Sequence, residues 1–164
     1  MRSTGEVLGV GRTFTEAMYK GFIGAGTPIP QRGSRILVSV REIDKDNFLP
    51  MAKSFTKMGC KFIATPGTAK YLADNGIETE VCKKISDGIP NVLDIIRSGM
   101  VDMIIDIPKK GNDAHSDGFK MRRCAAECTI PMMTSLDTVG ALVKVMEEKL
   151  SSENTRIVEL NEIK

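Results

Sequence analysis

The stretch that decides the fold is residues 35–69, which read RILVSVREIDKDNFLPMAKSFTKMGCKFIATPGTA. It opens with a β-rich apolar run at 36–40. Residues 46–58 then carry apolar side chains at helical spacing, and Gly59 follows as a helix stop. A second β-rich run begins directly afterwards, at 61–65. A strand, a helix and a second strand joined in this way predict a parallel βαβ unit.

The same alternation continues along the chain and predicts an α/β fold. This fold is a Rossmann-like three-layer sandwich with a mostly parallel sheet of about five strands and helices on both faces. Right-handed crossovers bring the C-terminal ends of the strands to one edge, where such sheets bind ligands. We expect helices at 68–75, 91–98, 117–128 and 137–150, strands at 78–82, 101–106 and 131–134, and a last short strand or a tail at 155–162.

The first part of the chain has a different character. Thr13 and Glu16 have the spacing of a capping box and predict a short helix over 14–23. A stretch rich in Gly and Pro follows at 24–30 and is typical of a linker. We therefore divide the chain into an N-terminal segment, residues 1–33, and a domain, residues 34–164.

Composition excludes several classes of protein. The 23 basic and 21 acidic residues leave a net charge of +2, which does not favour nucleic-acid binding. No apolar run is long enough for a transmembrane helix, and the N-terminus lacks a signal-peptide pattern. The four cysteines form no CxxC pair and the one histidine, His115, stands in a polar stretch, so we expect free cysteines and no metal site.

Polar side chains gather where the predicted strands end, and they suit a phosphate group. A helix start offers free N–H groups, a glycine allows close approach, threonine hydroxyls donate, and lysines supply charge. Helix capping by the threonines and solvation of the lysines would explain the same pattern without a ligand. The residues are Ser39, Lys45, Thr65, Gly67, Thr68, Lys84 and Asp106.

Six segments resemble, in order and spacing, the methylglyoxal-synthase-like domain at the C-terminus of carbamoyl-phosphate synthase large chains. The opening residues 1–14 are similar to the stretch that leaves the second ATP-using half of such chains. The resemblance therefore covers nearly the whole sequence and implies that residues 1–33 are an interdomain segment. The six segments are LVSVR at 37–41 with Asp44 and Lys45, ATPGTA at 64–69, KISDGIPN at 84–91, IIDIP at 104–108, DGFKMRR at 117–123, and 131–137.

The resemblance implies a regulatory domain that binds a small phosphorylated effector. In bacterial members the effector is a nucleoside monophosphate such as UMP or IMP, whereas animal mitochondrial members use N-acetylglutamate. The family's phosphate contacts correspond to Lys45, Thr65, Thr68 and Lys84. The ribose and base side corresponds to Ser39, Val92, Asp106 and Pro108.

Three positions depart from the family pattern and leave the nucleoside open. The family commonly has Asn at the place of Asp106, Thr or Ser near Pro108, and Arg where Ile89 precedes Pro90. Asp106 can accept from ribose hydroxyls, but it cannot donate and would repel a nearby phosphate.

The resemblance also implies a wider setting. The whole synthase is a cytoplasmic, glutamine-hydrolysing, ATP-dependent ligase whose product feeds pyrimidine and arginine biosynthesis. ATP, Mg and bicarbonate belong to the rest of the large chain, so this chain is expected to have no cofactor, no catalytic residue and no activity alone. Its partners would be the rest of the large chain, the glutaminase small chain and the effector, with no nucleic acid and no membrane.

Three alternatives stay open. Methylglyoxal synthase shares the fold, but it needs a catalytic Asp in a glycine-rich segment after the third strand, where this chain has Ser86-Asp87-Gly88. The IMP cyclohydrolase domain shares part of the pattern, but its long insert after the third strand is missing here. A ligand-free interaction module is the third alternative.

Overall fold

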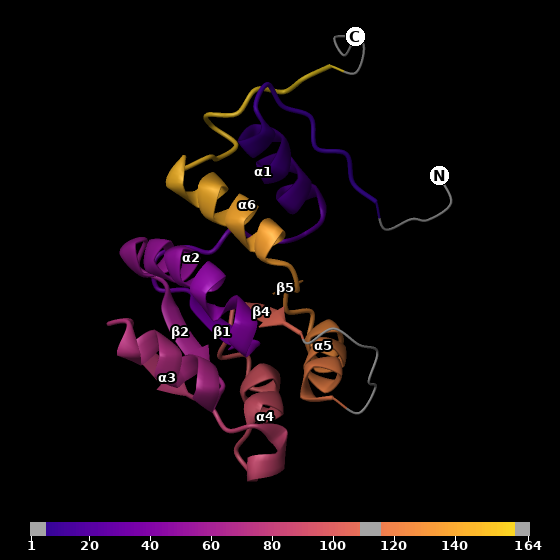
Figure 1. Cartoon of the computed structure of the whole chain (residues 1–164). Coiled ribbons are helices and arrows are strands. Elements are labelled where there is room, and N and C mark those ends of the chain that lie inside the picture. The colour runs from indigo at the N-terminus through magenta and orange to yellow at the C-terminus, as the bar shows by residue number, and fades with distance from the viewer. Residues whose placement is uncertain (1–5, 109–115, 160–164) are drawn as a thin grey trace. The chain divides into compact units, whose positions relative to one another are not determined.

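The computed structural model describes residues 6–108 and 116–159 (Figure 1). Contacts within the chain divide it into two compact units. The larger unit holds residues 30–139, and the smaller one joins residues 1–29 with residues 140–164. The predicted division into an interdomain segment, residues 1–33, and a regulatory domain, residues 34–164, concerns a longer parent chain and stays a prediction.

The larger unit contains the predicted parallel sheet, with five strands in the order β3-β2-β1-β4-β5. All four strand pairs are parallel, which confirms the predicted fold class. From β1 the chain winds outward to β3 and then returns to the other side of β1 with β4. The direction of winding therefore reverses between β1 and β4, where doubly wound folds bind ligands. The strands are β1 Arg35–Val40, β2 Lys61–Ala64, β3 Thr79–Val81, β4 Met103–Ile107 and β5 Met132–Met133.

Helices cover both faces of this sheet because its strands are apolar on both sides. On one face Phe62 of β2 meets the rings of Phe48 and Phe55 edge-on, with centroids 6.4 and 6.2 Å apart. On the other face the next residue, Ile63, joins a buried cluster that includes Val92 and Met121. The first face carries α2 Lys45–Lys57 and α3 Pro66–Asp74, and the second carries α4 Val92–Arg97 and α5 Asp117–Glu127.

The element boundaries differ from the predicted ones by one or two residues at most places. The predicted start of the helix at Thr68 is wrong, because Thr65 has an extended backbone and Pro66 opens α3 in its first turn. Proline suits that position because its fixed φ is already helical and no intrahelical N–H bond is lost. Two 3₁₀ turns, Glu42–Asp44 and Ile85–Asp87, were not predicted. Residues 155–159 form no strand, and 160–162 lie outside the described residues.

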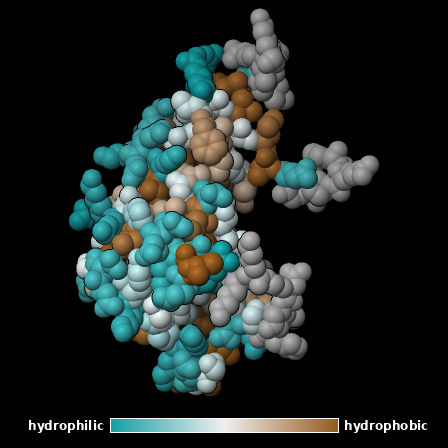
Figure 2. Space-filling model, in the orientation of Figure 1, coloured by the Kyte–Doolittle hydropathy of each residue, from teal (hydrophilic) through white to brown (hydrophobic). Residues whose placement is uncertain are grey.

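The smaller unit is built from α1 Phe14–Gly24 and the part of α6 from Gly140 onward, α6 being Leu136–Glu147. The Thr13 hydroxyl accepts from the Glu16 N–H at 3.1 Å, so the predicted N-cap is confirmed. The Glu16 carboxylate accepts from the N–H of Arg12, whereas in a capping box it would accept from the N–H of the N-cap residue, Thr13. Lys20 donates to the carbonyls of Val10 and Arg156 and thereby ties the two chain ends together. Figure 2 shows hydrophobic surface over the part of the chain that carries α1.

Within the described residues, no helix is long and apolar enough to cross a membrane. The four cysteines are free, and three of them, Cys60, Cys82 and Cys124, are buried. Burial raises the pKa of the Cys82 thiol to about 11, so this side chain behaves as a small apolar core group.

The Phe62 contacts predict a stability difference between two phenylalanines. Phe62 is 3% exposed and Phe119 is 42% exposed. Phe62→Ala should lower the free energy of unfolding by about 3–5 kcal/mol because it leaves a cavity between two rings and the sheet. Phe119→Ala should cost less than about 1 kcal/mol. Denaturant titration followed by circular dichroism measures both, and equal losses would contradict this description of the core.

Candidate functional site

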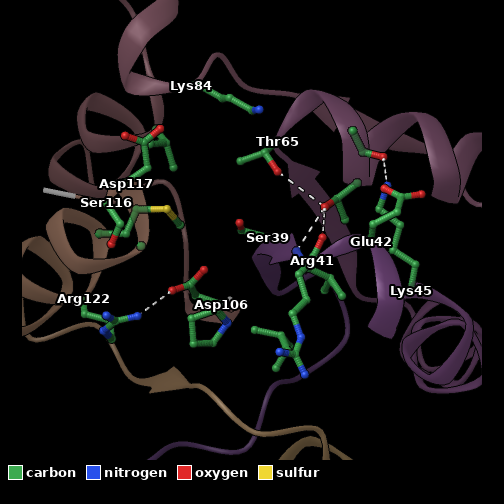
Figure 3. A pocket seen from close by; sticks show the side chains of 18 residues that line it. Ser39, Arg41, Glu42, Lys45, Thr65, Lys84, Asp106, Ser116, Asp117 and Arg122 are labelled. Atoms are coloured by element: carbon green, nitrogen blue, oxygen red, sulfur yellow. Dashed lines mark hydrogen bonds and ion pairs between the residues drawn. The ribbon is translucent and has the colours of Figure 1, made fainter. Parts of the chain in front are cut away.

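A cavity of about 640 Å³ opens at the C-terminal edge of the sheet, where β1 and β4 lead to opposite faces. It lies within the larger unit, and its lining residues come from β1, β4, the helices α2, α3, α4 and α5, and adjoining loops; Figure 3 shows their side chains converging on it. All eight residues predicted for the effector line it: Ser39, Lys45, Thr65, Thr68, Lys84, Val92, Asp106 and Pro108.

Lys45 is the buried cation of the cavity. It opens α2 and is only 6% exposed. Its ammonium donates to the carbonyl of Gly67 at 2.8 Å and to the carboxylate of Glu42 at 2.5 Å. The ring of Tyr71 lies 5.6 Å from Nζ, which adds a cation–π contact. These three contacts hold the Lys45 ammonium in one position.

Thr68 has a structural role that the sequence did not reveal. Its buried hydroxyl accepts from the N–H of Val40 at 3.1 Å and donates to the carbonyl of Val40 at 3.3 Å. A hydroxyl has one proton, so Thr68 cannot give the same proton to a ligand. Thr65 lies beside it, with Oγ1 3.4 Å from the Thr68 oxygen, and its more weakly held hydroxyl is the better donor to a ligand.

Gly67 leaves space at the first turn of α3. A Cβ atom at this position would lie 3.7 Å from the Lys45 ammonium and would meet no other atom within 4 Å. Any side chain would therefore project toward the cation, into the cavity that Gly67 lines. The glycine thus allows an anion to reach both Lys45 and the positive end of α3.

Lys84 lies on the rim, where its side chain reaches over the cavity (Figure 3). The other three basic side chains of the cavity are held by carboxylates: Arg41 by Asp44, Lys45 by Glu42 and Arg122 by Asp106. Among the residues that the structure describes, Lys84 is the cavity cation without such a partner. Its charge is therefore available to a ligand.

Asp106 closes the other end of the cavity. In the parallel register Leu37 pairs with Ile104 and Ser39 with Asp106, so the two polar residues continue an apolar stripe on the α5 face. The carboxylate forms an ion pair with Arg122 at 3.2 Å, and Ser39 stands next to it in the register of the sheet. Burial raises the pKa of Asp106, while Arg122 and Ser39 act in the opposite direction.

Arg122, which the sequence analysis did not assign to the site, offsets the repulsion expected between Asp106 and a phosphate. It belongs to the segment 117–123, which resembled the family but received no role. The sequence did contain a signal for this role. In a parallel sheet, the helix that follows the fourth strand begins near the edge at which all the strands end, so its first turns can reach the site. Ile89, one of the three departures, is 81% exposed and does not line the cavity.

Across residues 6–108 and 116–159, no three His, Cys, Asp or Glu side chains are grouped to hold a metal ion. His115 lies outside the described residues.

Gly118 should be essential for the Asp106–Arg122 ion pair. A Cβ atom on Gly118 would lie 2.9 Å from Asp106 Oδ2 and 3.4 Å from Arg122 Nη1. Gly118→Ala should therefore lower the free energy of unfolding by about 1–3 kcal/mol, despite the better helix propensity of Ala, because the buried carboxylate loses its partner. Gly67→Ala is the matched control, since it also stands second in its helix. Denaturant titration should find Gly67→Ala near wild type; equal stability of the two variants would contradict the role of Gly118.

The raised pKa of Asp106 predicts a pH dependence. The folded chain holds this proton more tightly than an unfolded aspartate, whose ordinary pKa is 3.8. From about that pH up to the raised value the folded state binds more protons, so the contribution of Asp106 to stability falls as pH rises. The free energy of unfolding of wild type minus that of Asp106→Asn should decrease over this window and then level off. Urea titrations at a series of pH values measure it, and a difference that rises with pH would overturn the assignment.

Comparisons with known proteins agree with this fold. A solved methylglyoxal synthase from Elizabethkingia anophelis NUHP1 superposes with a TM-score of 0.57 over 69% of this chain and 78% of that one, at 18% identity. This likeness shows the shared fold.

Closer similarity comes from sequence. The chain is 45% identical over 161 residues to the carbamoyl phosphate synthase large chain of Clostridium botulinum (strain Loch Maree / Type A3), and 48% identical over 149 residues to that of Clostridium beijerinckii. These matches cover 98% and 91% of this chain, but they span only 15% and 14% of the relatives' length. A family model described as the MGS-like domain matches residues 47–134, more than half of the sequence. The chain therefore belongs to the MGS-like domain family, and it resembles a part of carbamoyl phosphate synthase large chains.

Proposed function

We propose that this chain is the effector-binding domain of a carbamoyl phosphate synthase large chain. It binds a phosphorylated effector, a nucleoside monophosphate such as UMP or IMP, at the C-terminal ends of its parallel strands. Binding regulates carbamoyl phosphate synthesis for the pyrimidine and arginine pathways.

One observation carries the proposal. Lys84, which has no carboxylate partner among the described residues, faces the same cavity as the first turn of α3, where Gly67 leaves space for a ligand. Lys84 supplies the charge from the rim, and Lys45 supplies it from the floor. In the first turn of α3, Pro66 has no N–H and the Thr68 N–H donates to the Thr65 carbonyl, so the Gly67 N–H is the backbone donor that this turn offers to an anion. A phosphate would meet charge, the Thr65 hydroxyl and a helix N-terminus together, as anions commonly do in α/β folds.

The other end of the cavity suits a polar, uncharged group. Asp106 and Ser39 offer oxygen acceptors, and the paired Arg122 keeps this end close to neutral. Ribose hydroxyls can donate to such acceptors, as they do to acidic residues in dinucleotide folds. Val92 and Pro108 add apolar surface for the nucleoside.

The chemistry of the synthase would lie outside this chain. ATP, Mg and bicarbonate would bind to the rest of the large chain, glutamine would be hydrolysed by the small chain, and the complex would work in the cytoplasm. This domain would regulate the catalytic sites through its connection to the rest of the large chain. By itself it should make no carbamoyl phosphate.

A lyase of the methylglyoxal synthase type is disfavoured by the position of Asp87. This residue is exposed, does not line the cavity, and accepts from the Lys84 backbone N–H at 3.3 Å and the Ser86 hydroxyl at 2.9 Å. It therefore caps a 3₁₀ turn instead of facing a bound phosphorylated substrate. An assay for methylglyoxal from dihydroxyacetone phosphate tests this alternative directly.

Lys84→Ala should weaken UMP or IMP binding by roughly 10- to 100-fold, because a charge-assisted hydrogen bond contributes about 1.5–3 kcal/mol. The unliganded stability should barely change, since the side chain is exposed. Lys53→Ala is the control, because Lys53 is exposed on α2 and does not line the cavity. Gly67→Ala should also weaken binding, since its methyl group would stand beside the Lys45 ammonium.

Isothermal titration calorimetry with UMP and IMP measures these affinities. Ligand at about 100 times its dissociation constant stabilises the fold by about 2.7 kcal/mol, so the shift in melting temperature gives a second readout. If Lys84→Ala and Lys53→Ala bind the better ligand equally well, the phosphate site is elsewhere.

A further inference from the structure

Glu42 lies at the mouth of the cavity with its carboxylate on the Lys45 ammonium. Its Oε2 is 2.5 Å from Nζ, yet the two side chains differ strongly in exposure, 83% for Glu42 and 7% for Lys45. The pair therefore joins an anion in solvent to a cation inside the protein. Figure 3 shows the two side chains together on the α2 side of the cavity.

The cation of this pair cannot move away easily. Nζ also donates to the Gly67 carbonyl at 2.8 Å and lies over the Tyr71 ring. The Tyr71 hydroxyl in turn donates to Asp46 at 2.5 Å, which fixes the ring. When an anion enters at the first turn of α3, the group that can give way is the Glu42 carboxylate.

The other two ion pairs of the cavity are built differently. Asp106, which pairs with Arg122, is buried. Asp44, which pairs with Arg41, is mostly buried as well. Of the three pairs, only that of Glu42 has its carboxylate in solvent, where an ion pair is weak and the side chain can leave at little cost.

We propose that Glu42 is a displaceable counterion, a built-in competitor that occupies Lys45 in the unliganded chain and leaves when a phosphate binds. This inference rests on the proposed phosphate site. Because the competitor belongs to the same chain, it is present at a high effective concentration. It therefore raises the concentration of effector needed to fill the site, and it keeps weak anions off Lys45.

The test compares Glu42→Gln with wild type and with Glu80→Gln. Gln keeps the shape and the oxygen but removes the charge. Glu80 is a matched control: it is also exposed and pairs with a cation, Arg35 at 2.8 Å, away from the cavity. Titrations with UMP, and with inorganic phosphate as the smallest probe, are run at low salt and repeated at about 0.5 M salt, where exposed charges are screened.

Glu42→Gln should bind both probes about 3- to 10-fold more tightly at low salt. The gain should shrink at high salt, and Glu80→Gln should stay within about twofold of wild type. Unchanged or weaker binding by Glu42→Gln, with wild type still binding, would overturn the counterion and leave the phosphate site standing. Equal gains in both variants would also overturn it, because net charge alone would explain them. Failure of wild type and both variants to bind either probe would overturn the proposed function and the counterion together.

Discussion

The Thr68 hydroxyl bridges the N–H and the carbonyl of Val40, and the geometry of the cavity depends on this contact. β1 pairs with β2 only as far as Val38, because beyond Ala64 the chain turns into α3. The last residue of β1 would then have unpaired backbone groups on that side, which is costly in a buried position. Thr68 takes the place of the missing strand. It holds the start of α3 against the end of β1, so that Gly67 and Lys45 face one another.

The charges around the cavity follow a consistent pattern. Buried or mostly buried charges have a partner of opposite charge, as Asp106 has in Arg122, because an unpaired buried charge is costly. Exposed groups, Lys84 and Glu42, are the ones that can change partner when a ligand arrives. The fixed pair keeps the Asp106 end close to neutral, whereas Lys84 and Glu42 would control the end proposed to bind phosphate. The proposed ligand would thus meet one end of the cavity with fixed charges and one end whose charges can change partner.

Much of this could be predicted from the sequence because its signals are local. Apolar spacing, Gly59 and Gly76 as helix stops, and Thr13 as an N-cap gave the alternation of strands and helices and most boundaries within one or two residues. The C-terminal ends of parallel strands lie at the same edge of a sheet, so the residues at these ends were expected to lie together there. The cavity brings all eight of them together. What an individual side chain does there depends on neighbours that local spacing does not specify.

The sequence by itself determined the order of the elements and the edge that carries the site, because hydrophobic periodicity and crossover handedness act along the chain. Only the tertiary structure decided the partners. Arg122 reaches Asp106 across 16 residues once α5 docks beside β4, and Gly118 leaves the space for that contact. The Thr68 hydroxyl bonds the backbone of Val40 because β2 ends at Ala64 and leaves those backbone groups without a strand partner. The Glu42 carboxylate meets a buried lysine because a 3₁₀ turn, not foreseen from sequence, places it over α2. Hydrogen bonds and ion pairs form between atoms a few ångströms apart, and such distances exist only after the chain has packed.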